Sequence, residues 1–156
     1  LVSYIRRALP RKVIHAFGIA STLSMHLMYS MGIDSVDSSA WRLKAAFGAI
    51  QLPGIGDRYI SKRERWKDYR DISVEERQLL DDCHCPVCRM DGLDSLCESF
   101  SARAIHNAWI YQSEAMLARK LIRTGEYDDY VDNILSRSVR FSRLFALTKK
   151  HKSKTV

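Results

Sequence analysis

Three cysteines within six residues are the feature of the sequence with the clearest chemistry. Cys83, Cys85 and Cys88 follow the pattern C-x-C-x2-C, which brings three thiolates within reach of one ion. They are too close in sequence to close useful disulfide loops with one another, so they favour a metal and a reducing compartment, the cytoplasm. The other interpretation is three reduced cysteines in a turn.

A zinc ion at this knuckle needs a fourth ligand, because structural Zn²⁺ is held by four sulfur or nitrogen donors in a tetrahedron. His106 is the favoured candidate, since a predicted helix would hold it rigidly and the neighbouring Asn107 could support its ring. Cys97 is the alternative, whereas His84 lies between two ligands and would have to point back at the metal. Four protein ligands close the coordination sphere, so we expect a structural Zn²⁺ that performs no chemistry.

Asp37 is a second candidate for chemistry, because it falls at the end of a predicted strand between small residues that leave it accessible. Asp34 precedes it by three positions and is expected on the opposite face of the strand, so the two do not form a paired-carboxylate site by themselves. A lone aspartate at such a position is more often a cap or a turn former than a nucleophile.

The elements that must position Asp37 form a βαβ unit. The pattern predicts a strand over residues 13–19, a helix over 21–31 and a second strand over 33–39. Such units make parallel strands, so the carboxyl ends of both strands, Gly18 with its neighbours and Asp37 with Ser38, open on one edge of the sheet. In α/β barrels that edge carries the chemistry.

The remaining elements are predicted as one further strand followed by helices. We expect a strand over 45–52, a loop over 53–57 and a solvated charged stretch over 61–71. A helix should follow the capping box of Ser73 and Glu76, and a long helix should run from the capping box of Ser95 and Glu98 to about Arg123. The last helix is expected over 127–150. The predicted domain organisation is strands and helices over 1–72, a zinc-binding segment over 73–125, and a basic helix and tail over 126–156.

Positive charge is concentrated at the carboxyl end. The chain of 156 residues has 25 Lys and Arg against 18 Asp and Glu, and seven of these bases lie in residues 137–156, which contain no acid. This favours a nucleic-acid partner, although a solvated terminus is the other interpretation. The candidates for phosphate contacts are Arg137, Arg140, Arg143, Lys149 and Lys150.

An uncharged stretch over residues 13–33 is the only segment that invites a transmembrane interpretation. It contains two histidines and three serines, and the mean hydropathy of the chain is −0.24. We therefore expect no membrane partner.

The glycine-ended strand, the aspartate strand and the C-x-C-x2-C knuckle with His106 together resemble the carboxyl-terminal part of the tRNA-guanine transglycosylase family, over residues 13–123. That family comprises pentosyltransferases of the queuine and archaeosine type, which replace a guanine in nucleic acid with a 7-deazaguanine. The resemblance implies the last βα units of a (β/α)8 barrel of the TIM type, an α/β fold, with a helical zinc-binding subdomain. It also implies dimers formed near the zinc.

The resemblance also implies roles for individual residues. Asp37 matches the catalytic nucleophile, and Phe17 and Gly18 match base-binding positions, Phe17 being the side chain that packs on the exchanged base. The matched zinc ligands are Cys83, Cys85, Cys88 and His106. A carboxylate can trap the oxocarbenium-like state of base exchange as a covalent glycosyl-enzyme, so the role suits an aspartate.

Three features set the chain apart from the tRNA enzymes of the family. Ser38 and Ser39 follow Asp37 where the bacterial enzymes have a proline-threonine-arginine run. Only 17 residues separate Cys88 from His106, and residues 51–58 have no counterpart that we can place. These departures point to the DNA-modifying branch, which inserts 7-deazaguanines into DNA, or to the archaeal branch.

Length sets a further expectation. A complete barrel takes about 250 residues. The chain is therefore expected to be a carboxyl-terminal fragment or one half of a split enzyme, catalytically incomplete without the missing amino-terminal barrel half. The alternative function is a noncatalytic, zinc-dependent nucleic-acid-binding module.

Overall fold

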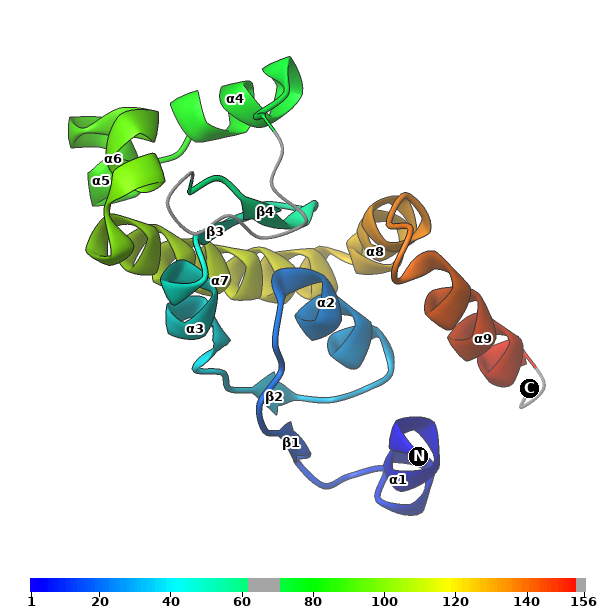
Figure 1. The fold of residues 1–156 in the computed structure, drawn as a ribbon. Helices are drawn as coiled ribbons and strands as arrows, with labels where there is room; N and C mark the ends of the chain where they lie inside the picture. Colours follow the sequence, from blue (N-terminus) through cyan, green and yellow to red (C-terminus); the bar gives the residue numbers. More distant parts are fainter. Residues whose placement is uncertain (62–70, 154–156) are drawn as a thin grey trace. The chain divides into compact units, whose positions relative to one another are not determined.

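The computed structural model describes residues 1–61 and 71–153 and has a mixed α/β structure that is mostly helical (Figure 1). The elements are α1 (Val2–Ala8), β1 (His15–Ala16), α2 (Thr22–Ser30), β2 (Ser35–Val36), α3 (Ala40–Ala46), β3 (Ala49–Leu52), β4 (Gly56–Tyr59), α4 (Val74–Asp81), α5 (Pro86–Met90), α6 (Gly92–Glu98), α7 (Phe100–Thr124), α8 (Tyr127–Ser136) and α9 (Ser142–Ser153). Most of the charged stretch expected to be solvated, residues 62–70, lies outside the described residues. Within the described part of the chain, no helix combines the length and apolar character that a bilayer crossing requires.

The chain divides into two compact units that are not continuous in sequence. Unit 1 is formed by residues 1–19, 23–38 and 116–156, and unit 2 by residues 20–22 and 39–115. The three sequence segments named above stay a prediction.

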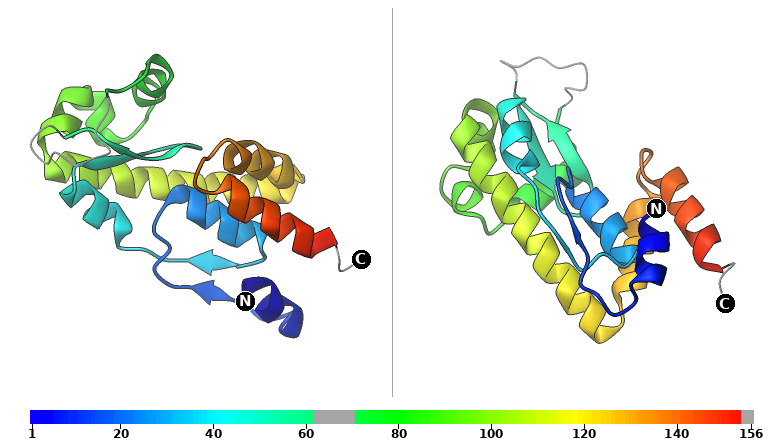
Figure 2. Two further views of the ribbon diagram at one scale, coloured as in Figure 1. Left: turned by 45° about the vertical axis from the view of Figure 1, so that its right-hand side comes forward. Right: turned by 90° about the horizontal axis from the view of Figure 1, so that it is seen from below.

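Strands β1 and β2 of unit 1 pair in parallel, with His15 opposite Ser35 and Ala16 opposite Val36, and α2 lies between them in the sequence (Figure 2). The predicted βαβ unit is therefore confirmed, although each strand has only two residues. Main-chain hydrogen bonds continue the pairing past the strand ends: the N–H of Asp37 donates to the oxygen of Ala16 at 3.3 Å, and the N–H of Ile19 donates to the oxygen of Asp37 at 3.0 Å.

The core of unit 1 is formed by α2, the end of α7, α8 and α9. Its buried apolar side chains are Leu23, Leu27, Ala118, Tyr127, Val131, Ile134, Leu135 and Phe145. Because apolar residues recur at helical spacing through this region, the sequence predicts one helix over 127–150, and this is wrong. The hydroxyl of Ser136 donates back to Asp132, and the Oγ of Ser138 accepts the N–H of Phe141 as a new helix begins.

Unit 2 is built around an antiparallel hairpin, β3–β4, in which Ala49 lies opposite Tyr59 and Leu52 opposite Gly56. The predicted strand over 45–52 is shorter than expected, because α3 occupies its first two residues, and the first two residues of β4 were expected as loop. All four residues of β3 are buried. Two of them belong to the apolar core of unit 2, which includes Ile50, Leu52, Ile60, Leu80, Leu96 and Ile110.

The predicted capping box of α4 is present, because Ser73 Oγ accepts the N–H of Glu76 and the Glu76 carboxylate accepts the N–H of Ser73. The second predicted box is wrong. Ser95 lies inside α6, and α7 begins after Ser99, whose Oγ accepts the N–H of Ala102. Helix α7 ends as expected before Gly125, which has a φ of +79°.

Candidate functional site: a metal-ligand cluster and an aspartate edge

The cysteine knuckle is the amino terminus of α5. Cys85 precedes the helix, its Sγ accepts the N–H of Cys88 at 3.3 Å, and Pro86 begins the first turn. This turn places three thiol groups beside the ring of His106 on α7, with Nδ1 at 3.8, 3.5 and 3.4 Å from the sulfurs of Cys83, Cys85 and Cys88 respectively. Tetrahedral Zn²⁺ with ordinary bond lengths separates a ligand nitrogen from a ligand sulfur by about 3.6 Å. The four ligand atoms lie within 4.8 Å of one another, so the cluster can hold one metal ion.

The orientation of His106 is fixed by the main chain of β3. Its Nε2 lies 2.9 Å from the oxygen of Gln51, and this carbonyl can only accept, so Nε2 carries hydrogen and Nδ1 is the ring nitrogen that faces the sulfurs. Gln51 is held in turn by Asn107, whose Oδ1 accepts the Gln51 N–H at 2.7 Å. The amide nitrogen of Asn107 donates to the oxygens of Trp41 and Ala49. Asn107 thus supports His106 through β3.

The electrostatics of the cluster are those of a site that favours a cation. Hydrogen bonds from Cys83 and Cys88 lower the pKa of Cys85, while hydrogen bonding with Cys83 and Cys85 raises the pKa of Cys88. Burial lowers the pKa of His106, but hydrogen bonds with Cys83 and Cys85 outweigh it and raise that pKa to about 9. Three crowded thiols cannot all ionise beside one another without a compensating charge, which a divalent ion supplies.

The other two sequence candidates lie outside this cluster. Cys97 is half-buried and packs against the apolar core of unit 2, and His84 is exposed. Among the described residues, the ligand atoms that converge are therefore three sulfurs and the imidazole nitrogen of His106.

In unit 1, Asp37 and Gly18 meet at the edge where β1 and β2 end. The N–H of Gly18 donates to Asp37 Oδ1 at 2.9 Å, while 57% of the Asp37 side chain is exposed. Gly18 adopts a φ of +69°, in the left-handed region that favours glycine. The side chain of Phe17 is also exposed, so the edge offers an accessible carboxylate, a glycine main chain and an aromatic ring.

His15 belongs to the same edge, and it is not among the site residues expected from the sequence. Its Nδ1 lies 2.8 Å from the Oγ of Ser35, and its Nε2 lies 4.0 Å from Asp37 Oδ1. Its ring also meets that of Phe17 edge-on, with centroids 4.5 Å apart. The available signal was its place two residues before Phe17, which puts both on one face of a strand. Its pairing with Ser35 depends on strand register.

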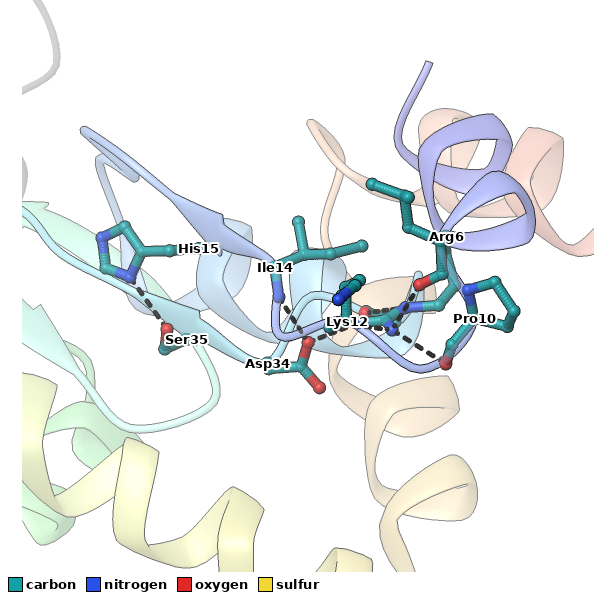
Figure 3. Close-up of polar contacts among 9 residues, drawn as sticks. Arg6, Pro10, Lys12, Ile14, His15, Asp34 and Ser35 are labelled. Carbon is teal, nitrogen blue, oxygen red and sulfur yellow. Dashed lines mark hydrogen bonds and ion pairs between the residues drawn. The ribbon is translucent and has the colours of Figure 1, made fainter.

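Asp34, three residues before Asp37, has a structural role. Its Oδ2 accepts the N–H of Ile14 at 2.7 Å and forms an ion pair with Arg6 (Figure 3). The Ile14 hydrogen bond and the Arg6 guanidinium hold the pKa of Asp34 below its usual value. Arg6 also donates to main-chain oxygens of Gly32, at 2.7 Å, and of Lys12, at 2.9 Å. The guanidinium therefore ties α1 and the following loop to the start of β2.

The five basic side chains expected to contact phosphates are exposed, but they do not share one helix. Arg137 follows α8, Arg140 lies in the connection and Arg143 is in α9, so the expected row on a continuous helix is absent from the described residues. Lys149 pairs with Asp132 and lies 5.1 Å from the centroid of the Phe145 ring.

Comparisons with known proteins agree with this arrangement. The profile of the family described as queuine tRNA-ribosyltransferase matches residues 1–140. The tRNA-guanine(15) transglycosylase of Pyrococcus abyssi (strain GE5 / Orsay) is 29% identical over 133 residues, which are 79% of this chain and 19% of that protein. The protein of the same name from Haloarcula marismortui is 26% identical over 132 residues, 77% of this chain and 22% of that protein. The chain thus spans about a fifth of the length of these relatives, and it belongs to the queuine tRNA-ribosyltransferase family, the tRNA-guanine transglycosylases.

Proposed function

We propose that this chain carries the nucleophile and the zinc-binding part of a guanine transglycosylase, a pentosyltransferase that exchanges guanine in nucleic acid for a 7-deazaguanine. The observation that carries the proposal is the accessible Asp37 carboxylate, held by the N–H of Gly18 where two parallel strands end. Family membership supplies the reaction class.

Asp37 would attack the anomeric carbon of the ribose that bears the guanine. The bond from this carbon to the guanine breaks as the carboxylate bond forms, which gives a covalent glycosyl-enzyme and avoids a free oxocarbenium ion. The incoming 7-deazaguanine then attacks the same carbon and releases the carboxylate. Asp34 is less suited than Asp37 to this role, because the Arg6 guanidinium and the N–H of Ile14 stabilise its negative charge and so make it a weaker nucleophile.

Phe17 and Gly18 would bind the exchanged base. The exposed ring of Phe17 offers a flat apolar face for stacking, and the main chain of Gly18 can approach a base closely because no side chain intervenes. Both residues lie close to Asp37 in space, because the main chain of Asp37 is hydrogen-bonded to Ala16 and to Ile19, which flank them in the sequence.

A zinc ion would be held by the sulfurs of Cys83, Cys85 and Cys88 and by Nδ1 of His106. The donor set and the nitrogen-to-sulfur distances fit this metal. With four protein ligands the ion has no open position, so it would tie α5 and α7 of unit 2 together and leave the base exchange to Asp37.

The proposed substrate is nucleic acid, with Arg137, Arg140, Arg143, Lys149 and Lys150 contacting phosphates. The relatives' names favour tRNA. DNA is the other proposed substrate class, because the two serines after Asp37 depart from the pattern of the bacterial tRNA enzymes. In DNA the target base must be flipped out of the duplex at a cost of a few kcal/mol.

We propose that the last units of a (β/α)8 barrel are present here and that further polypeptide completes the active site, because the chain covers about a fifth of the length of its relatives.

Covalent trapping tests the proposal. The chain, together with the polypeptide that completes the barrel, is mixed with a guanine-containing tRNA stem-loop or with duplex DNA, and protein-bound nucleic acid is measured after denaturation. We expect an adduct that Asp37→Asn abolishes and that the matched variant Asp34→Asn retains. An adduct that persists in Asp37→Asn would show that the nucleophile lies elsewhere. The acceptor that gives the faster adduct identifies the substrate class.

The noncatalytic zinc-dependent binding module is the second candidate, and the exposure of all five basic side chains favours it. Salt-dependent binding to both nucleic acids without an adduct to either would support it over the enzyme.

A further inference from the structure

We propose that His15 and Ser35 form a relay that positions the Asp37 carboxylate and assists its departure in the second half of the exchange; this rests on the proposed function of Asp37. The arrangement is a line of three side chains across the β1–β2 pair. Ser35 Oγ lies 2.8 Å from His15 Nδ1, and His15 Nε2 lies 4.0 Å from Asp37 Oδ1. Figure 3 shows the first of these contacts.

The tautomer of His15 follows from its two neighbours. A carboxylate repels a ring nitrogen that presents a lone pair and attracts one that carries hydrogen. The hydrogen of the neutral ring is therefore favoured on Nε2, facing Asp37, and Nδ1 accepts a hydrogen bond from the Ser35 hydroxyl. Ser35 can play this part because the strand register places it directly opposite His15.

The separation of 4.0 Å is within ion-pair range but longer than a hydrogen bond. The Asp37 side chain is 57% exposed and the His15 side chain 35% exposed, so both have room to rotate. Catalytic hydrogen bonds commonly shorten only when substrate is bound. A small rotation of the carboxylate gives Oδ1 two donors, the main-chain N–H of Gly18 and the ring N–H of His15.

This arrangement distinguishes the two carboxylate oxygens. The contacts that the structure gives to the Asp37 carboxylate within its described residues fall on Oδ1, which leaves Oδ2 as the attacking oxygen. In the first step the Oδ2–C1′ bond forms while the C1′–N9 bond breaks, and guanine leaves with that electron pair and takes up a proton from water. In the second step the incoming base bonds to C1′ and loses its proton to water, while the electron pair of the C1′–Oδ2 bond returns to Asp37. The proton gained by guanine balances the one lost by the incoming base, so His15 ends each cycle unchanged.

Two donors on Oδ1 favour the second step more than the first. The carboxylate has its full negative charge when free and loses it in the ester, so hydrogen bonds to Oδ1 are stronger after departure than before. His15 thus acts through Asp37, and it is a positioning residue that limits how long the covalent intermediate persists.

The experiment compares adduct formation and adduct breakdown in single-turnover reactions of the assembled enzyme. His15→Phe keeps a ring but removes the donor, and we expect breakdown to slow by about 10- to 100-fold, with adduct accumulating and KM little changed. His15→Gln retains an N–H donor and should restore most of the breakdown rate. Ser35→Ala, which leaves the ring in place, should slow breakdown by about 2- to 10-fold.

The outcomes separate this inference from the proposed function. Loss of the adduct in Asp37→Asn with wild-type rates of both steps in His15→Phe would overturn the relay alone. Equal slowing of both steps in His15→Phe, without rescue by His15→Gln, would assign His15 a merely structural role and also overturn it. Persistence of the adduct in Asp37→Asn would overturn the proposed function itself.

A measurement without turnover gives an independent check. Nitrogen-15 NMR of histidine-labelled protein distinguishes the two neutral tautomers, and His15→Phe assigns the signal among the five histidines. We expect hydrogen on Nε2 and a change of the signal in Ser35→Ala. A neutral ring with hydrogen on Nδ1 would contradict the relay whatever the activity of the enzyme.

Discussion

His106 and Gln51 are joined by a hydrogen bond of 2.9 Å between the ring Nε2 and the main-chain oxygen of β3. This bond decides which ring nitrogen faces the three sulfurs, so the metal-ligand cluster depends on the position of a strand that contributes no ligand. Asn107 holds that strand through the N–H of Gln51 and the oxygen of Ala49.

The substitution Asn107→Ala should therefore weaken metal binding without removing a ligand. We expect the affinity for Zn²⁺ to fall about 10- to 100-fold, as for loss of other outer-sphere partners of metal-bound histidine. Competition with a chromogenic chelator measures this affinity. Gln112→Ala, an exposed position on the same helix, is the matched control and should bind Zn²⁺ as the wild type does. Equal affinities for Asn107→Ala and wild type would show that β3 does not support the site.

The contacts of Asp34 should make the free energy of unfolding of unit 1 depend on pH. The pKa of Asp34 is lowered on folding, first by the Ile14 hydrogen bond and also by Arg6. The ionised carboxylate therefore stabilises the folded state at pH values above the ordinary pKa of an aspartate. This stabilisation is lost as the pH falls through the lower pKa of the folded state. Because 45% of the side chain is exposed, Asp34→Asn should cost only a few tenths to about 1 kcal/mol at neutral pH. Urea denaturation of wild type and variant should show this difference shrinking below about pH 3.9. A difference that stays constant across the acidic range would contradict the role of the ionised carboxylate.

The part of the fold that could be predicted is the part encoded locally. Ser21 and Thr22 at the start of α2 and Gly32 just beyond its end delimit a helix between two apolar runs, so the parallel pair followed. The four-ligand cluster followed from cysteine spacing and from a histidine on a long helix.

What was missed depends on tertiary structure. The break between α8 and α9 was hidden because apolar residues such as Val131 and Phe145 keep a helical period on both sides of it. The route from Asn107 to His106 passes through Gln51, which is distant in sequence, and the contact of His15 with Ser35 requires a register that only the folded pair defines.

The basic side chains near the carboxyl end should differ in their effect on nucleic-acid binding. Each phosphate contact changes the slope of log K against log salt by about 0.7 to 0.9, so Arg143→Ala should flatten the slope by about that amount. Lys149→Ala should change it less, because Asp132 already neutralises part of that charge. Fluorescence anisotropy with a tRNA stem-loop over a range of salt concentrations measures both. If the slope of log K against log salt for Arg143→Ala matches that of the wild type, Arg143 does not contact a phosphate.

The ligand set itself predicts opposite behaviour for two cysteines separated by 12 positions. Cys85 is fully buried with its sulfur 3.5 Å from His106 Nδ1, whereas Cys97 packs against the apolar core outside the cluster. Cys97→Ser should therefore retain one Zn²⁺ per chain by elemental analysis after dialysis, while Cys85→Ser should lose it. Because metal affinity is folding free energy in such sites, Cys85→Ser should also unfold at lower temperature and respond little to added chelator. Metal loss in Cys97→Ser with retention in Cys85→Ser would replace the proposed ligand set.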